Sequence, residues 1–391
     1  MHKAITVLWL GIICMKVYLV LFARHTINMK DLISILAITL LVSTSCAGQD
    51  KLRPPLPALP RADLTSVKMN PDTIAKAIQF ISSHPNKDFR GMVVIKDNKL
   101  VVEEYFGTFW RETIHDIRSA GKSVSALLLG IAIDKGLVKS TEQSIYDFFP
   151  STKFVRPAKD KHLDIKIKHL LAMSSGLNAD DDADNSPGST GNWLTEDNWV
   201  NFAITLPMLF TPGEKYVYND VCPMLIGAII EETSGKKLAA FAQENLFTPL
   251  GIREFYWYTA PNGSTVPMGN LYISTLDFAK LGQLVINKGE WQGKKIVSSA
   301  WINELSVKRF DLSKDDPFAD GYGYFWFTAT KEVNGKKYDC VYASGNGGNL
   351  LFVVPSENLV VGLTSSAYGQ GYGHRRSRAI FQYVLRSLAK D

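Results

Sequence analysis

The chain contains 391 residues, of which 46% are hydrophobic and 21% charged, enough apolar content for one large domain or two modest ones. Its 43 basic and 38 acidic side chains give a net charge of +5, and beyond residue 46 the counts of 39 and 37 leave only +2. Charges so nearly balanced exclude the strongly basic surface typical of nucleic-acid-binding proteins, so we expect no nucleic acid among the partners.

Residues 1–46 have the pattern of a targeting region rather than of a folded domain. Met29-Lys30 precedes the apolar run 32–42, and small residues then lead to Cys46. A basic start, a short apolar core and a small-residue cleavage region predict a secretory signal at 29–45. Because a cysteine follows directly, as in a bacterial lipobox, we expect Cys46 to carry a lipid and the protein to be exported, either periplasmic or anchored to a membrane as a lipoprotein.

A second apolar stretch, residues 4–22, precedes this signal and is long enough to span a bilayer. Two successive export segments would be redundant, so we expect Met29 to be the true initiator; a genuine transmembrane anchor is the alternative. Four prolines between positions 47 and 65 then predict a stiff tether. One domain is expected to follow, over residues 66–390.

The domain opens with signals for a helix and a hairpin. An amphipathic helix is predicted over 70–82, with a proline at its first turn. Two β-rich runs follow, at 92–96 and 99–106, and Asp97-Asn98 between them is typical of a tight turn.

The middle of the domain differs from both ends. Residues from about 137 to 270 are mostly helical and rich in loops by their pattern, for example over 162–173 and 223–235. Later elements are predicted as strands over 321–326, 337–343, 350–354 and 359–364, and as a helix over 376–390. Early and late strands around a helical middle predict an α+β fold: one antiparallel sheet flanked by helices, with an inserted, mostly helical subdomain.

The strongest candidate for chemistry is the stretch 117–123, which is followed by the apolar run 124–133. Only Ser125 in that run is polar, so a helix there would be buried on all sides. Ser119 would lie in its first turn, with Lys122 on the same face three residues later. Burial disfavours a charged amine, so we expect the pKa of Lys122 to fall and the amine to move protons near neutral pH.

A Ser-x-x-Lys pair at the head of a buried helix is the acyl-transfer arrangement known in penicillin-binding proteins and β-lactamases. The serine needs a neighbouring base, and the helix start directs free N–H groups toward a developing oxyanion. The pattern alone is weak, because it recurs at Ser234 and at Ser387, and neither heads an apolar helix. The alternative is that Ser119 only begins a helix and that Lys122 is solvated.

Further motifs recur in a fixed order along the chain. They are His115–Ser123, His169–Leu177, Pro212-Gly213, Tyr218–Asp220, Leu225–Gly227, Leu281–Leu284, Gly289–Trp291 and Ala343–Gly348. On these motifs, residues 88–388 resemble the class C β-lactamase-like serine hydrolases of the serine β-lactamase and penicillin-binding-protein superfamily. That branch includes esterases, D-amino-acid peptidases and 6-aminohexanoate-dimer hydrolase.

The resemblance implies roles for named residues. Ser119 would be the acylated nucleophile, Lys122 its proton partner, and Tyr218 the general base toward Ser119 and the proton donor to the leaving group. Lys122 is the cation available to lower the pKa of the phenol. The backbone N–H groups of Ser119 and Asn346 would form the oxyanion hole. The mechanism uses neither a metal nor an organic cofactor, so we expect none.

Two departures from the family pattern bear on the substrate. Asp220 stands where the second motif usually ends in asparagine, and Ala343-Ser344-Gly345 stands where lysine-threonine-glycine or histidine-x-glycine is common. The second change removes the cation that would bind a β-lactam carboxylate. We therefore expect Asp220, Ser344 and Gly345 to contact a neutral or amine-bearing amide or ester, and β-lactamase activity to be weak.

Other features have simpler interpretations. The acidic run 180–184 lacks the glycine and glutamate of a calcium loop and is interpreted as a solvated loop. Cys222 and Cys340 are either two buried free thiols, which we favour, or one disulfide. His115 and His169 are interpreted as structural. The aromatic residues interpreted equally well as cleft or as core are Trp193, Trp199 and Tyr216.

The sequence thus predicts a serine hydrolase that cleaves an amide or ester bond in a small molecule through a Ser119 acyl-enzyme. One alternative is a D-alanyl peptidase or β-lactamase that acts on cell-wall peptides or β-lactams. Another is a penicillin-recognising sensor that is acylated without turnover.

Overall fold

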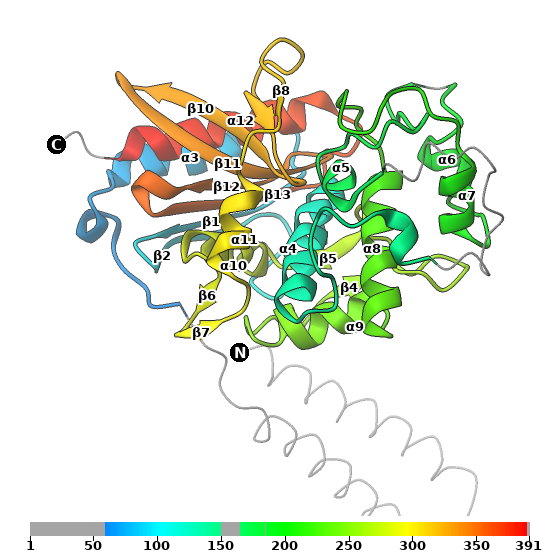
Figure 1. Ribbon diagram of the computed structural model, residues 1–391. Coiled ribbons are helices and arrows are strands. Elements are labelled where there is room, and N and C mark those ends of the chain that lie inside the picture. Colours follow the sequence, from blue (N-terminus) through cyan, green and yellow to red (C-terminus); the bar gives the residue numbers. More distant parts are fainter. Residues whose placement is uncertain (1–58, 150–164, 184, 389–391) are drawn as a thin grey trace, which may run out of the picture. The chain divides into compact units, whose positions relative to one another are not determined.

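The computed structural model describes residues 59–149, 165–183 and 185–388 (Figure 1). The predicted signal at 29–45 and the predicted lipidation site, Cys46, lie outside these residues. Over the described ranges, no helix has the length and apolarity needed to cross a membrane.

The predicted tether, 47–65, is described only from residue 59 onward, and this part is folded against the sheet. The carbonyl of Pro60 accepts a hydrogen bond from the Leu100 amide at 2.8 Å. The last part of the predicted tether is therefore hydrogen-bonded to the strand that contains Leu100.

An eight-stranded sheet forms the centre of the unit, with every neighbouring pair antiparallel and the strand order β2-β1-β13-β12-β11-β10-β9-β8. Its strands are β1 (Phe89–Lys96), β2 (Lys99–Tyr105), β8 (Phe310–Asp311), β9 (Gly321–Tyr322), β10 (Phe327–Val333), β11 (Lys336–Gly345), β12 (Asn349–Val354) and β13 (Leu359–Ser365). The predicted β1–β2 hairpin is confirmed, because Asp97 and Asn98 have the positive φ values, 53° and 59°, that its tight turn requires.

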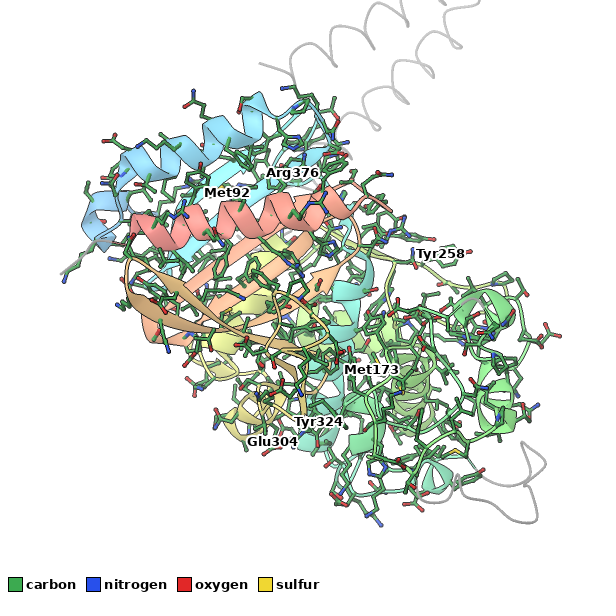
Figure 2. All side chains as sticks on the ribbon, turned by 90° about the horizontal axis from the view of Figure 1, so that it is seen from above. Met92, Met173, Tyr258, Glu304, Tyr324 and Arg376 are labelled. Atoms are coloured by element: carbon green, nitrogen blue, oxygen red, sulfur yellow. The ribbon has the colours of Figure 1, made fainter. Side chains whose placement is uncertain are left out.

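Helices cover both faces of this sheet. Helices α3 (Pro71–Ser83) and α12 (Gly371–Ser387) lie side by side on one face, whereas α10 (Thr275–Ile286) packs on the other (Figures 1 and 2). Phe352 of β12 stacks on Phe381 of α12 with ring centroids 3.9 Å apart. The buried guanidinium of Arg376 pairs with Asp88 Oδ1 at 2.5 Å, which ties α12 to the start of β1.

Helix α4 (Gly121–Asp134) runs between β11 of the sheet and α8 (Val221–Ser234). It is buried from Gly121 to Ala132, as its apolar sequence predicts. Other helices of the predicted helical region are α5 (Ile167–Leu171), α6 (Thr190–Trp193), α7 (Trp199–Thr205) and α9 (Leu238–Ala242). The strands β4 (Tyr256–Trp257) and β5 (Leu271–Ile273) join β3 (His115–Asp116) in a second sheet, of order β3-β5-β4.

Shorter elements complete the described fold. A two-stranded sheet pairs β6 (Glu290–Trp291) with β7 (Lys294–Lys295), and α11 (Ser299–Leu305) follows it. Single turns lie at η1 (Leu64–Val67), η2 (Arg118–Ala120), η3 (Ile145–Asp147), η5 (Gln243–Phe247) and η6 (Pro355–Glu357).

Three predicted elements have different bounds in the structure. Within the described residues, the helix predicted over 162–173 is only the short α5 (Ile167–Leu171). The strand predicted over 321–326 stops at Tyr322, because the chain turns at Phe325, whose φ is 56°. The last helix begins at Gly371 rather than at residue 376. By helix propensity, its glycines would interrupt a helix. Gly373 is nevertheless required, because a Cβ at that position would lie 2.5 Å from the Gly347 carbonyl oxygen.

The aromatic stack between β12 and α12 gives a test of the fold. Phe381→Ala removes a fully buried ring, and we expect the free energy of unfolding to fall by about 3–5 kcal/mol. Urea unfolding followed by circular dichroism measures the change. Gln382→Ala, on the exposed face of the same helix, should change the stability by less than about 0.5 kcal/mol. Equal effects of the two variants would contradict this packing.

Candidate active site

Ser119 lies in the single turn η2, directly before the buried helix α4. The last residue of β11, Gly345, presses against this turn, since a Cβ at Gly345 would lie 2.0 Å from the carbonyl oxygen of Ile117. Only glycine permits so close an approach of two backbones. This contact with the sheet therefore fixes the position of the turn that carries Ser119.

The residue before Ser119 has an unusual backbone conformation. Arg118 has a φ of 53°, in the left-handed region, which is disfavoured for a non-glycine residue by about 1 kcal/mol. Asp116 stabilises it by accepting a hydrogen bond from the Arg118 amide at 2.8 Å and by pairing with its Nε at 3.1 Å. Burial raises the pKa of Asp116, whose Oδ2 also accepts from Asn270 at 3.2 Å. This small network holds the turn that presents Ser119.

Lys122 extends from the first turn of α4 back toward Ser119, and its side chain is 3% exposed. Its Nζ lies 3.0 Å from Ser119 Oγ, 2.9 Å from the Met268 carbonyl oxygen and 2.7 Å from Asp220 Oδ1. The carbonyl and the carboxylate can only accept hydrogen bonds, so they take two of the three N–H groups of an ammonium. The third N–H is left for a hydroxyl beside it.

The prediction that the pKa of Lys122 falls is wrong. Burial does lower it, but the charge of Asp220 and the phenol of Tyr218 outweigh burial and raise the pKa of Lys122 above its ordinary value. An opposite charge at 2.7 Å in a water-poor site has this effect. Lys122 is thus a fixed cation beside Ser119 rather than a neutral amine.

Tyr218 lies beside this cation. Lys122 Nζ is 4.9 Å from the centroid of the Tyr218 ring, and the phenol contributes to raising the pKa of the amine. The loop that carries Tyr218 is held by its neighbours, since the Val217 amide donates to the Met173 carbonyl at 2.8 Å. The sequence predicted that Ser119, Lys122 and Tyr218 converge, and the structure brings them together.

Asp220 is partly buried next to Lys122, at the start of α8. Its second carboxylate oxygen accepts a hydrogen bond from Thr190 Oγ1 at 2.9 Å. Both the hydroxyl and the amide of Thr190 also lie within 2.8 Å of Asp181 Oδ1. Asp220 is therefore already ion-paired, so the structure gives no support to the expectation that its charge is free for a substrate amine.

Asp181 corrects the interpretation of the acidic run as a solvated loop. Asp182 is exposed, but Asp181 is turned toward the site and packs behind Thr190. Burial and the nearby charge of Asp220 raise the pKa of Asp181. Nothing in the local sequence distinguished Asp181 from its acidic neighbours. Among the described residues, no group of His, Cys, Asp or Glu side chains has the arrangement of a metal site.

The predicted residues of the third motif have different positions. Asn346 lines the same cavity as Ser119, as the oxyanion-hole prediction requires. Gly345 faces the Ile117 carbonyl, and Ser344, the preceding residue of the strand, contacts His374 of α12 at 3.3 Å. Because side chains alternate along a strand, Ser344 is directed to the face opposite Ser119. The predicted contact of Ser344 with a substrate has no counterpart in this geometry.

The cavity at Ser119 has a volume of about 650 Å³, within the range of small-molecule sites. Its polar and apolar lining residues are Arg118, Ser119, Thr190, Leu194, Asp220, Tyr258, Val266, Met268, Gly269, Asn270, Tyr272, Asn346 and Tyr368. Tyr258 stands at the surface, 39% exposed (Figure 2). A small molecule that enters past this ring reaches the hydroxyl of Ser119.

The aromatic residues of the cavity are not the ones singled out by the sequence. Trp193 and Trp199 are buried in the core and meet edge-to-face at 5.2 Å, and Tyr216 packs on Tyr322 at 5.0 Å. Their interpretation as core is therefore correct. Tyr258 and Tyr272 line the cavity instead, and the sequence analysis singled out neither of them.

None of the described cysteines or predicted structural histidines is among the residues that line the cavity. Cys222 and Cys340 are free and buried, which confirms the favoured prediction. Burial raises the pKa of Cys222 to about 11. His115 is buried beside Tyr368, and this burial lowers the pKa of the imidazole to about 4. His169 accepts a hydrogen bond from the Lys166 amide at the start of α5.

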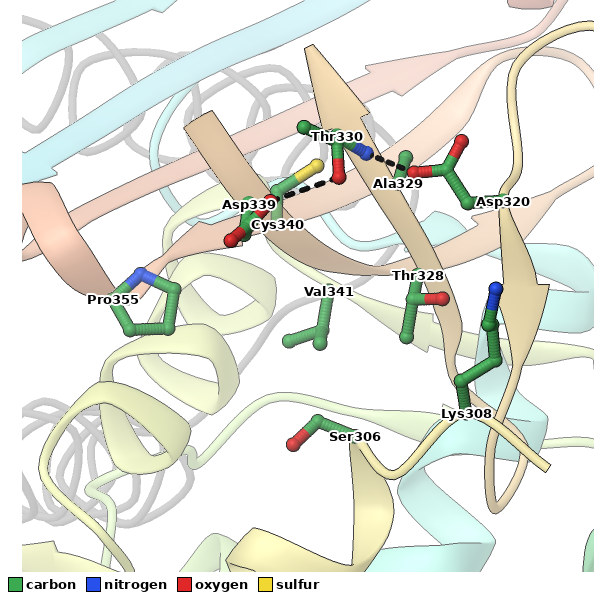
Figure 3. Close-up of a pocket in the computed structure, with 10 residues that line it drawn as sticks. All are labelled: Ser306, Lys308, Asp320, Thr328, Ala329, Thr330, Asp339, Cys340, Val341 and Pro355. Atoms are coloured by element: carbon green, nitrogen blue, oxygen red, sulfur yellow. Dashed lines mark hydrogen bonds between the residues drawn. The ribbon is translucent and has the colours of Figure 1, made fainter. Parts of the chain in front are cut away.

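A second cavity, of about 380 Å³, lies on β10 and β11, but it offers no comparable chemistry (Figure 3). Its Asp320 accepts from the Thr330 amide, and the Thr330 hydroxyl donates to Asp339 at 2.8 Å. Burial raises the pKa of Cys340 there to about 12, so the thiol stays protonated. The cavity at Ser119 is therefore the candidate active site.

A family model described as beta-lactamase matches residues 77–385, which is well over half of the chain. The chain belongs to the β-lactamase family. It is accordingly a serine hydrolase that acts on amide or ester bonds. The matched range includes every site residue described above, from Asp116 to Tyr368.

Individual relatives of this β-lactamase-family protein are distant. An uncharacterised protein of Alkalihalophilus pseudofirmus is 22% identical over 314 residues, which cover 72% of this chain and 84% of that protein. Matches to proteins of Escherichia coli that are named as D-alanyl-D-alanine carboxypeptidase candidates span only half or less of those proteins.

Solved structures share the fold at low sequence identity. A penicillin-binding-protein homologue from Caulobacter crescentus has a TM-score of 0.64 and 17% identity, over 82% of this chain and 99% of that one. A D-stereospecific amidohydrolase from a Streptomyces species has a TM-score of 0.60 and 15% identity, over 81% and 99%. The predicted α+β fold of this family is thereby confirmed.

The ion pair at Lys122 makes a prediction about pH. Asp220→Asn removes the charge that contributes most to raising the pKa of Lys122, so the effect of burial is opposed less strongly and the pKa of the amine falls. The ammonium then loses its proton at lower pH, and the alkaline limb of the rate of Ser119 labelling by a fluorophosphonate should shift to lower pH. Asp197→Asn, which removes an exposed carboxylate, should leave the profile in place. An alkaline limb unmoved by Asp220→Asn would refute the role of this pair.

Proposed function

We propose that this protein hydrolyses a small amide or ester through a covalent acyl-enzyme on Ser119. The observation that supports the proposal most directly is the position of Lys122 Nζ, 3.0 Å from the Oγ of Ser119 and 4.9 Å from the centroid of the Tyr218 ring, where Ser119 lines a cavity of about 650 Å³. A serine hydroxyl, a fixed cation and a phenol in one cluster are the parts that acyl transfer needs.

Tyr218 acts as the base in this mechanism. Because Lys122 is held as an ammonium by Asp220 and Met268, it has no free lone pair to accept the Ser119 proton. Tyr218 instead takes the proton as Ser119 Oγ attacks the carbonyl carbon, and the charge of Lys122 lies beside the two oxygens between which the proton moves. The third N–H of Lys122 can donate a hydrogen bond to whichever of the two oxygens, Ser119 Oγ or the phenol oxygen of Tyr218, carries the negative charge.

The tetrahedral intermediate then collapses toward the acyl-enzyme. The N–H groups of Ser119 and Asn346 stabilise the oxyanion, and Tyr218 returns its proton to the leaving amine or alcohol. Water activated near Tyr218 attacks the ester on Ser119 and releases the acid, and Ser119 regains its proton. Each step moves one proton between groups that line the cavity or touch Lys122.

Three single variants test these roles. Ser119→Ala should abolish labelling by a fluorophosphonate probe, read by mass spectrometry of the peptide that contains residue 119. Lys122→Ala and Tyr218→Phe should each lower kcat/KM for a p-nitrophenyl ester by at least ~10²-fold, the range for a positioned proton-transfer group. Tyr216→Phe, two residues from Tyr218 and packed in the core, is the matched control. Full activity of Tyr218→Phe would remove the assigned base.

Substrate panels separate the alternatives. Steady turnover of nitrocefin or of peptidoglycan stem peptides, in excess of p-nitrophenyl esters and simple amides, would favour a β-lactamase or a D-alanyl peptidase. A burst equal to one acyl group per enzyme, without steady turnover, would favour a penicillin-recognising sensor.

We also propose that the protein is exported and carries a lipid on Cys46, because a signal pattern at 29–45 precedes that cysteine. Intact-mass analysis of the protein purified from membranes of its native host should find a chain that begins at a diacylglyceryl-modified Cys46. Retention of residues 1–28 in the mature protein would contradict both this proposal and the assignment of Met29 as the initiator.

A further inference from the structure

The cavity at Ser119 carries a cation that the predicted mechanism does not use. Arg118 lines the cavity directly beside Ser119, and its side chain remains 40% exposed. Lys122 is almost fully buried and pairs with Asp220. Among the cavity-lining residues within the described ranges, Arg118 is the one that offers a positive charge to a bound molecule.

The surroundings of Arg118 hold its guanidinium in place. One face lies over the Tyr368 ring, with Cζ 4.3 Å from the ring centroid, and Nε pairs with Asp116 Oδ2 at 3.1 Å. The left-handed φ of 53° at Arg118 sets the direction in which the side chain leaves the backbone. A guanidinium oriented in this way loses little further freedom when it binds a planar anion.

The acid that pairs with Arg118 is directed into the protein. Asp116 is 4% exposed, and its oxygens are occupied by the amide and Nε of Arg118 and by Asn270 Nδ2. The other carboxylate at the cavity, Asp220, is neutralised by Lys122 at 2.7 Å. The outer edge of the guanidinium is therefore the charge that a ligand meets next to the reacting serine.

We propose that Arg118 is a specificity-determining residue that binds a carboxylate on the substrate, so that the preferred substrates are amides or esters with an anionic group. This inference rests on the proposed function of Ser119. The third motif lacks its usual cation, and the sequence analysis therefore predicted a neutral or amine-bearing substrate. Our inference reverses that expectation, because Arg118 supplies a cation next to Ser119. A guanidinium binds a carboxylate through two parallel hydrogen bonds, which fixes the position of the adjacent carbonyl.

Matched ester pairs test the preference. For an anion on the acyl side, p-nitrophenyl monoesters of glutarate, adipate and suberate are compared with their methyl-capped neutral forms. For an anion on the leaving group, 4-acetoxybenzoate is compared with its methyl ester. In the wild-type full-length protein, we expect kcat/KM for the anionic member of at least one pair to exceed that of its neutral partner by about tenfold or more, as for a hydrogen bond between charged groups.

Variants assign the preference to Arg118. Arg118→Gln should bring the anionic-to-neutral ratio close to unity, and Arg118→Lys should keep part of it, because lysine retains the charge without the planar fork. The double variant Asp116→Asn with Arg118→Gln removes both members of the pair and should give the same ratio as Arg118→Gln. Arg111→Gln is the matched control, since Arg111 is also 40% exposed and pairs with Glu103 away from the cavity.

The outcomes distinguish this inference from the proposed function. Ester hydrolysis and labelling of Ser119 without any anionic preference, or a preference that survives Arg118→Gln, would overturn the role of Arg118 alone. Absence of both labelling and hydrolysis would overturn the proposed function, and this inference with it. If Arg118→Gln does not fold, added salt gives a second test on the wild-type protein: the preference should decrease as salt screens the exposed charge, and a preference insensitive to salt contradicts it.

Discussion

The ion pair between Lys122 and Asp220 is the interaction on which the chemistry of this protein depends. An ammonium with a side chain only 3% exposed is stable there because a carboxylate and a backbone carbonyl surround it at 2.7 and 2.9 Å. A buried charge without such partners would lose its proton instead. With them, a cation stays beside Ser119, and in the proposed mechanism Tyr218 is the group that accepts the proton.

The same pair also determines what the cavity presents to a ligand. Asp220 pairs with Lys122 and accepts a hydrogen bond from Thr190. The aspartate at this position, where the family pattern has asparagine, therefore affects the groups around Lys122 more than the surface that meets a ligand. The lining of the cavity that remains open to a ligand includes Arg118 and the tyrosines Tyr258, Tyr272 and Tyr368. In our proposal, the charge preference for a substrate is therefore set by Arg118 and not by the second motif.

The sequence predicted the parts of the site whose signals are local, and it missed those that depend on folding. Ser119 and Lys122 stand three residues apart before an apolar run, so their meeting follows from helical geometry. The raised pKa of Lys122 depends on Asp220, which lies far along the chain. The motifs placed Asp220 at the site but indicated a contact with the substrate rather than a pairing with Lys122. Asp181 and Thr190 were missed because their contacts with the site also depend on folding.

The fold was predictable to a similar degree. The antiparallel hairpin at Asp97-Asn98 and the buried helix after Ser119 follow from short patterns. The early start of α12 does not, because Gly373 appears as a helix breaker until its contact with the Gly347 carbonyl is known. A close contact between two backbones requires a small residue, and helix propensity carries no information about such contacts.

The pairing of β1 with β13 has a consequence for when the chain can fold. Met92 lies opposite Leu363, and the Asn70 amide before α3 donates to the Ser387 carbonyl at the end of α12. The sheet therefore cannot close until nearly the whole polypeptide has been delivered, whether by the ribosome or through a translocation channel. For the export that we propose, this topology would keep the chain from closing its sheet before nearly all of it has crossed the membrane.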